Sequence, residues 1–129
     1  MIEQLAYTLT SDKPFADVVA NIENQTAEHK FRVLAVHDVQ KTLEEKGLSR
    51  GPLKIIEVCN AVFAHEALSK NVNVALFMPC KYSVYEQDGK TFVTLGRPMM
   101  ISQMMPNAGL EDLAGRAEAT LKSIMEKSV

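Results

Sequence analysis

Asp88-Gly89 is the feature that most constrains how this chain can fold. The pair lies between two runs rich in β-branched and aromatic residues, at 82–86 and 91–95. Asp-Gly readily adopts the positive φ values of a two-residue hairpin turn, and such flanking runs are typical of paired strands. The sequence therefore predicts an antiparallel hairpin near the C-terminal third of the chain.

Two segments carry apolar residues at the spacing of an amphipathic helix. One begins near Phe15, and the other runs from Leu110 almost to the C-terminus. Ser11 or Asp12 is the expected N-cap of the first helix, and Pro14 fits its first turn. Both helices are expected to cover the same side of the sheet.

Four further runs, each mostly apolar, predict strands at residues 2–9, 31–36, 54–59 and 73–78. The run at 31–36 is almost wholly apolar, which is typical of a central strand covered on both faces. Short helices are expected at 39–46, where Asp38 is the N-cap, and at about 61–69. The whole pattern predicts an α+β two-layer sandwich with an antiparallel-rich sheet.

The composition predicts one packed domain that spans residues 1–129. Hydrophobic residues make up 47% of the chain and charged residues 23%, as in ordinary globular proteins. The net charge of −2, with scattered Lys and Arg, disfavours a nucleic-acid partner. No basic leader and no apolar run of ~20 residues is present, so no membrane association is expected. The expected location is the cytoplasm, where both cysteines are reduced.

Cys59 and Cys80 are the only cysteines, and each ends an apolar, strand-like run. Strand ends are where a sheet presents side chains to a ligand, so a small molecule or a metal ion is the expected partner. Glu57 shares a strand face with Cys59 by period two, and is expected to face water or to meet Lys54, Arg32 or a backbone amide. The candidate ligand-binding residues are Glu57, Cys59, Asn60, Cys80 and His37.

These residues also admit structural interpretations. Free cysteine is among the most often buried residue types, and no Cys-x-x-Cys motif is present. Asn60 and Pro79 are expected to shape the chain at the strand ends. The methionines at 99–105 are expected in the core or at a dimer contact rather than on a soft metal. His37, His65 and the carboxylates have no standard zinc spacing, so no metal site is predicted, and neither a catalytic residue nor a cofactor is assigned.

Several segments together resemble the DUF302 family: residues 31–38, 43–47, 56–60, 76–80 and 84–89. The resemblance extends over nearly the whole chain and implies a TBP-like β-α-β(4)-α fold with small extra helices. It also implies a homodimer and no established biochemical activity. The chain departs from many relatives at Ala61, where they carry Pro, which predicts a less rigid loop after Asn60.

Three functional hypotheses follow. The first is a dimeric small-molecule or ion-binding domain with its site near the cysteines. The second is a thiol-dependent enzyme or sulfur carrier with one nucleophilic and one resolving cysteine, which requires a lowered thiol pKa. The third is a structural dimer that serves a partner protein, with the methionine-rich segment at the interface.

Overall fold

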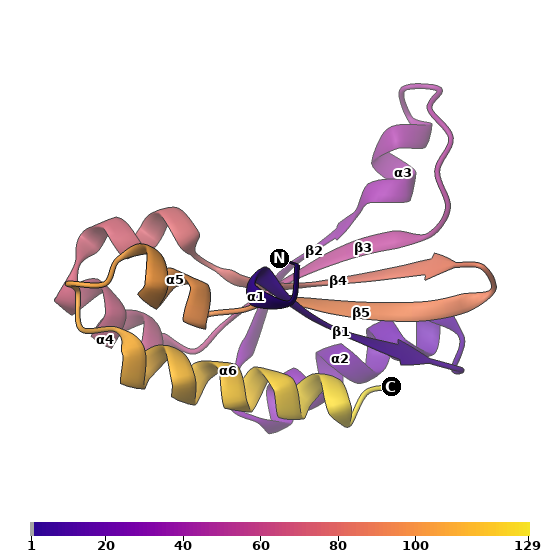
Figure 1. The fold of residues 1–129 in the computed structure, drawn as a ribbon. Coiled ribbons are helices and arrows are strands. Elements are labelled where there is room, and N and C mark those ends of the chain that lie inside the picture. Colours follow the sequence, from indigo (N-terminus) through magenta and orange to yellow (C-terminus); the bar gives the residue numbers. More distant parts are fainter. Residues whose placement is uncertain (1) are drawn as a thin grey trace.

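The computed structural model describes residues 2–129 (Figure 1). The elements in chain order are α1 (Ile2–Leu5), β1 (Ala6–Ser11), α2 (Phe15–Glu28), β2 (Arg32–Asp38), α3 (Val39–Glu44), β3 (Leu53–Cys59), α4 (Ala61–Lys70), the 3-10 helix η1 (Val72–Phe77), β4 (Cys80–Gln87), β5 (Lys90–Gly96), α5 (Met99–Met104) and α6 (Glu111–Glu126).

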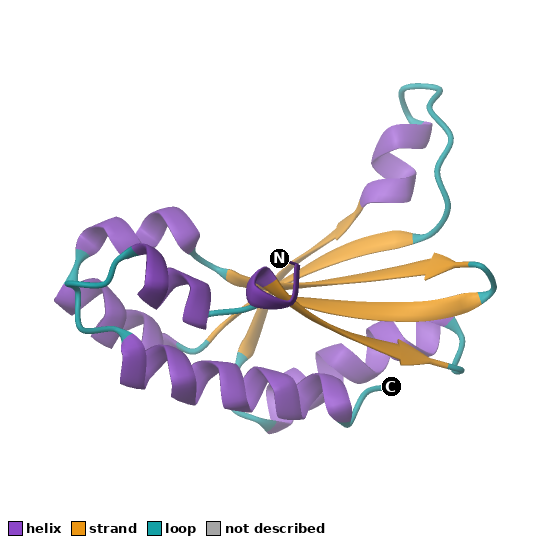
Figure 2. Ribbon diagram, viewed as in Figure 1, coloured by secondary structure: helices purple, strands orange, loops and turns teal. Residues whose placement is uncertain are grey.

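The five strands form one antiparallel sheet in the order β1-β5-β4-β3-β2. Figure 2 shows the two long helices, α2 and α6, on the same side of this sheet. Without the short helices, the order is β-α-β-β-β-β-α. The predicted α+β two-layer sandwich is confirmed, and the β-α-β(4)-α order implied by the family resemblance is present.

The predicted hairpin is β4 with β5, joined at Asp88 and Gly89. Both turn residues have positive φ, 53° for Asp88 and 76° for Gly89, as a two-residue hairpin turn requires. On the face away from the helices, Tyr85 and Phe92 are cross-strand partners whose rings stack with centroids 5.2 Å apart.

The main core lies between the sheet and the two long helices. Alternate residues of β3, β4 and β5 point into it, and they are Ile56, Val58, Tyr82, Val84, Val93 and Leu95. Leu121 and Ile124 of α6 and Val18 and Ile22 of α2 meet them, all fully buried. The Tyr82 hydroxyl donates a 2.6 Å hydrogen bond to the Leu121 carbonyl, which joins β4 to α6.

Two predictions near the N-terminus were wrong. Residues 2–5 form a short helix, and the first strand begins only at Ala6. Because that strand continues to Ser11, neither Ser11 nor Asp12 stands at the start of α2, and Pro14 is the N-cap residue. The Ser11 hydroxyl instead accepts a hydrogen bond from the Lys13 amide at 3.1 Å.

The run at 31–36 was wrongly predicted to be a central strand. It lies in β2, at one edge of the sheet, where Leu34 is 51% and Val36 is 38% exposed. An apolar run does not show whether neighbouring elements cover its side chains. A register shift between Val33 and Ala35 also bends this edge strand.

The predicted strand at 73–78 is the 3-10 helix η1. The Asn71 side chain caps it by accepting a hydrogen bond from the Asn73 amide at 2.9 Å. Val74 is buried whereas Leu76 is 82% exposed, a one-sided burial that a short apolar run does not reveal. Cys80 therefore begins β4 rather than ending a strand.

The remaining short helices agree with expectation. The Asp38 side chain caps α3 by accepting from the Lys41 amide at 3.0 Å, and α4 occupies the predicted position after Asn60. The methionine-rich segment forms the six-residue helix α5, which leads into α6. Figure 1 shows α4, η1 and α5 gathered at one end of the sheet, whereas α3 projects from the opposite end.

Candidate functional site

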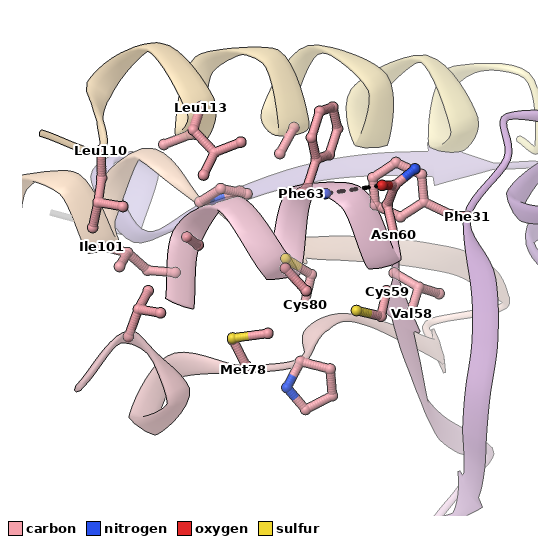
Figure 3. Close-up of a pocket in the computed structure, with 17 residues that line it drawn as sticks. Phe31, Val58, Cys59, Asn60, Phe63, Met78, Cys80, Ile101, Leu110 and Leu113 are labelled. Atoms are coloured by element: carbon pink, nitrogen blue, oxygen red, sulfur yellow. Dashed lines mark hydrogen bonds between the residues drawn. The ribbon is translucent and has the colours of Figure 1, made fainter. Parts of the chain in front are cut away.

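A pocket of about 80 Å³ lies where β3 ends and β4 begins, beneath α4 (Figure 3). Side chains from α4, η1, α5 and α6 complete its walls. Most of the lining is apolar, including Phe63, Val74, Ile101, Leu110 and Leu113. A concave apolar lining with few polar groups is typical of small-molecule sites, although this pocket is smaller than the roughly 300–1,000 Å³ of sites for drug-sized ligands.

Asn60 fixes the wall that α4 provides. Its side-chain oxygen accepts a 3.0 Å hydrogen bond from the Phe63 amide, and its side-chain nitrogen donates a 3.1 Å bond to the Lys30 carbonyl. The first bond is an N-cap, which stabilises the start of α4. Both ends of the amide are thus engaged in structure, although Asn60 also lines the pocket.

Glu118 fixes the wall that α5 provides. This carboxylate of α6 is 8% exposed and accepts hydrogen bonds from Arg97 Nε at 3.2 Å and Nη2 at 3.1 Å. It also accepts a 3.3 Å bond from the Met99 amide, and Lys122 Nζ lies 3.5 Å away. Burial acts to raise the pKa of Glu118, but these bonds and the two positive charges outweigh it and lower the pKa.

Cys59 and Cys80 both line this pocket. Val58 pairs directly with Cys80 in the sheet, so Cys59 is one residue away from that pair. Because β3 and β4 are antiparallel, the end of one strand lies beside the start of the other. Met78, two residues before Cys80, lines the same pocket, and Figure 3 shows all three sulfur side chains beneath α4.

Neither thiol is activated by its surroundings. Burial raises the pKa of Cys59. Burial, with the nearby charge of ionised Cys59, raises the pKa of Cys80 to about 11, against the opposing charge of Lys81. Both thiols therefore remain protonated near neutral pH, whereas nucleophilic cysteine chemistry needs a thiolate.

Glu57 and His37 lie outside the pocket. Ile56 and Val58 point into the core, so Glu57 between them points to the other face of the sheet. There its Oε1 lies 2.7 Å from Nε2 of His37, whose side chain is 55% exposed. The expected partners Lys54 and Arg32 do not form this contact. The five candidate residues thus divide into a pocket group of Cys59, Asn60 and Cys80 and a surface pair.

Sequence reasoning missed Met78 as a site residue because it was assigned to a strand. It also placed no pocket residue on α5 or α6, although Ile101 and Leu113 both line the site. The apolar face of the predicted helix at 61–69 was a usable signal, since Phe63 and Ala67 of that face line the pocket.

Two features are absent from the described part of the chain. Within residues 2–129, no group of three or more His, Cys, Asp or Glu side chains is placed to hold a metal ion. In the same part of the chain, no helix is both long and apolar enough to cross a bilayer.

The fold and its pocket define a two-layer α+β domain with an apolar site at one end of an antiparallel sheet. Residues 7–128 match the family described as "Domain of unknown function DUF302", so the chain belongs to the DUF302 family. It is similar to the crystal structure of an uncharacterized conserved DUF302 protein from Bacillus stearothermophilus, at 30% sequence identity and a TM-score of 0.92. That similarity covers 97% of this chain and 98% of the other. No curated protein matches the sequence.

Proposed function

We propose that the protein is a dimeric binding domain that holds a small molecule or ion in the pocket at the adjoining ends of β3 and β4. The observation that carries this proposal is the pocket itself, an apolar hollow of about 80 Å³ lined by Cys59, Asn60 and Cys80. An apolar hollow gains free energy by receiving apolar surface, so a small-molecule ligand of this pocket is expected to have an apolar part.

Binding is favoured over thiol catalysis by the state of the two cysteines. An attacking thiol works best when its pKa is near the ambient pH, whereas burial raises both thiol pKa values here, that of Cys80 to about 11. The hypothesis of a nucleophilic and a resolving cysteine therefore loses its main requirement. The two unpaired cysteines support a cytoplasmic location, where thiols are kept reduced.

Titration with hexan-1-ol tests whether the apolar part of the pocket binds a ligand. Amide chemical shifts of α4, α5 and α6 residues around the pocket are expected to move together and to saturate. Ala67 lines the pocket on α4, so Ala67→Phe fills the space and is expected to abolish the shifts. Ala64→Leu inserts a smaller side chain from the same helix, and it replaces Ala67→Phe as the test variant if Ala67→Phe does not fold.

Val62→Phe is the matched control, because Val62 lies on the same helix but is 71% exposed and is not part of the lining. It is expected to bind hexan-1-ol as the parent does. Shifts that never saturate in the parent protein, or saturating shifts that persist in both Ala67→Phe and Ala64→Leu, would overturn the proposed binding pocket.

The dimeric part of the proposal is supported by the face of the sheet away from α2 and α6. The stacked rings of Tyr85 and Phe92 lie on this face. At its edge, Leu34 of β2 is exposed, and Leu48, 57% exposed, lies on the segment that projects with α3 away from the helical layer (Figure 1). Exposed apolar groups on an unpaired strand edge are typical of a surface that another chain covers.

Analytical ultracentrifugation over a dilution series tests this assembly. The parent protein is expected to sediment as a dimer, and Leu34→Lys is expected to shift it to a monomer because a charge would be buried at the interface. Val62→Lys, on exposed α4, is the control and is expected to remain dimeric. A parent protein that is monomeric throughout would contradict the dimer and favour a different partner protein on this face.

A further inference from the structure

We propose that the sulfur-lined side of the pocket binds one soft monovalent metal ion, of the Cu(I) and Ag(I) class, through Cys59, Cys80 and Met78. This inference rests on the proposed binding function and names a ligand class for the same site. It differs from a zinc site in kind, because its third donor is a thioether.

The three donors come from the short segment where η1 ends and β4 begins and from the neighbouring end of β3. Cys80 pairs with Val58 and faces the core with it, and Cys59, the next residue and the end of β3, lines the same pocket. Met78 lies in the extended residues between η1 and β4 and lines the same pocket. Figure 3 shows the three sulfur side chains around one space beneath α4.

The donor set selects for soft ions. Thiolate and thioether sulfur suit soft ions such as Cu(I), whereas carboxylates and carbonyls favour Mg²⁺ and Ca²⁺. Thiolates also bind Zn²⁺, but a structural zinc ion takes four protein ligands, and this site offers three sulfurs. Neither a carboxylate nor an imidazole is part of this lining, since Glu57 and His37 pair on the other face of the sheet. Apart from the sulfurs, the Asn60 side chain is the one polar group of the lining, and both its ends are already hydrogen-bonded.

A route to the sulfurs and a compensating charge are both present. A wider groove of about 360 Å³ shares Met78 and Cys80 with the pocket, so these two donors are reached from this side. Lys81 also lines the groove and forms no salt bridge within the described residues. Binding releases the proton of each coordinating thiol, and two thiolates around one monovalent cation leave a net charge of −1, which the Lys81 ammonium offsets.

Anaerobic titration of the reduced protein with Cu(I), against a competing chelator of known affinity, tests the site. One copper per chain is expected. Cys59→Ser and Cys80→Ser are each expected to weaken binding by more than the ~10–100-fold that follows loss of an outer hydrogen-bond partner from a metal site. Met78→Leu is expected to weaken it by about 10-fold, at the lower end of that range.

Met104→Leu is the matched control, because Met104 lies in the outer groove, is 60% exposed and does not line the pocket. The affinity of Met104→Leu for Cu(I) is expected to equal that of the parent protein. Copper X-ray absorption of the parent protein needs no variant to fold, and it is expected to show sulfur scatterers alone. Nitrogen or oxygen ligands, or equal affinities in Met78→Leu and Met104→Leu, would overturn the three-sulfur site.

The hexan-1-ol titration separates failure of this inference from failure of the proposed function. If Cu(I) is bound weakly or by non-sulfur ligands while hexan-1-ol still saturates the pocket, the metal site is refuted and the binding pocket stands. If hexan-1-ol binding also fails, the proposed function is refuted with it. Cys59→Ser is expected to lose Cu(I) and keep hexan-1-ol, whereas Ala67→Phe, at the far end of α4 from Cys59, is expected to do the reverse.

Discussion

Glu118 joins α6 to the segment that begins α5, and its replacement by Gln is expected to destabilise the fold measurably. Its carboxylate receives two hydrogen bonds from Arg97 and one from the Met99 amide at the start of α5. A glutamine side chain at this position would keep one oxygen acceptor, but its NH₂ group would face the guanidinium donors of Arg97. The substitution therefore removes a charge-assisted bond and leaves donors opposed.

The expected loss follows from the burial of the pair. Glu118 is 8% exposed and Arg97 28% exposed, so water replaces the lost bond poorly. Hydrogen bonds to charged groups contribute about 1.5–3 kcal/mol, which predicts a loss of about 2 kcal/mol for Glu118→Gln. Glu66→Gln is the matched control, because Glu66 pairs with Arg116 at the surface, where the side chains are 40% and 47% exposed. Such exposed pairs contribute about 0.2–1 kcal/mol.

Urea unfolding measures both variants. With a typical slope of ~2 kcal/mol per molar urea, Glu118→Gln is expected to lower the midpoint by about 1 M at pH 7, and Glu66→Gln by less than half of that. Equal midpoints for the two variants would refute the argument that burial gives the Glu118 network its strength.

The stability difference between the parent protein and Glu118→Gln is expected to depend on pH. Because the native pKa of Glu118 is lowered, its ionised form stabilises the fold above the ordinary carboxyl pKa of 4.5, and this stabilisation is lost as the pH falls through the lowered native pKa. The gap between the parent and Glu118→Gln is therefore expected to be widest near neutral pH and to shrink on acidification. A gap that stays constant into the acid range would show that the charge contributes nothing.

Two further predictions concern the core and the thiols. Tyr82→Phe removes the buried hydrogen bond to the Leu121 carbonyl and is expected to cost about 1 kcal/mol in urea unfolding, whereas Tyr85→Phe, on the open face, is expected to cost almost nothing. Equal losses would contradict this assignment of the bond. Iodoacetamide is expected to modify Cys80 more slowly than Cys59 in the native protein, with a Cys80 rate that still rises toward pH 11, whereas urea-unfolded protein is expected to show nearly equal rates. A rate that levels off below pH 8 at either cysteine would restore the thiol-enzyme hypothesis.

Local patterns predicted most of the fold. Asp88-Gly89 predicted the hairpin because its backbone preference acts within two residues, and the stripe after Leu110 predicted α6 because apolar side chains repeat with the helical period. Elements whose identity depends on distant partners were harder to predict from the sequence. The run at 31–36 carries no sign of being an edge, since that property belongs to the strand order.

The site shows the same division. The sequence placed Cys59 and Cys80 at strand ends, and antiparallel pairing of β3 with β4 brings them to one pocket even though residues 73–78 form a 3-10 helix. Ile101 and Leu113 reach that pocket only because α5 and α6 return to the sheet end, which no local pattern encodes. The pairing of Glu57 with His37 likewise depends on the register of β2 against β3.

Native mass spectrometry of the freshly purified, unreduced protein tests the central claim most directly, because one spectrum reports the number of subunits and any bound mass. A dimer is expected that carries an added mass per chain. This mass is expected to disappear in Ala67→Phe if it is an organic ligand, and in the Cys59→Ser, Cys80→Ser double variant if it is a metal ion. An added mass retained in all of these variants, or a parent chain that is monomeric and bare, would contradict a dimeric domain that binds its ligand in this pocket.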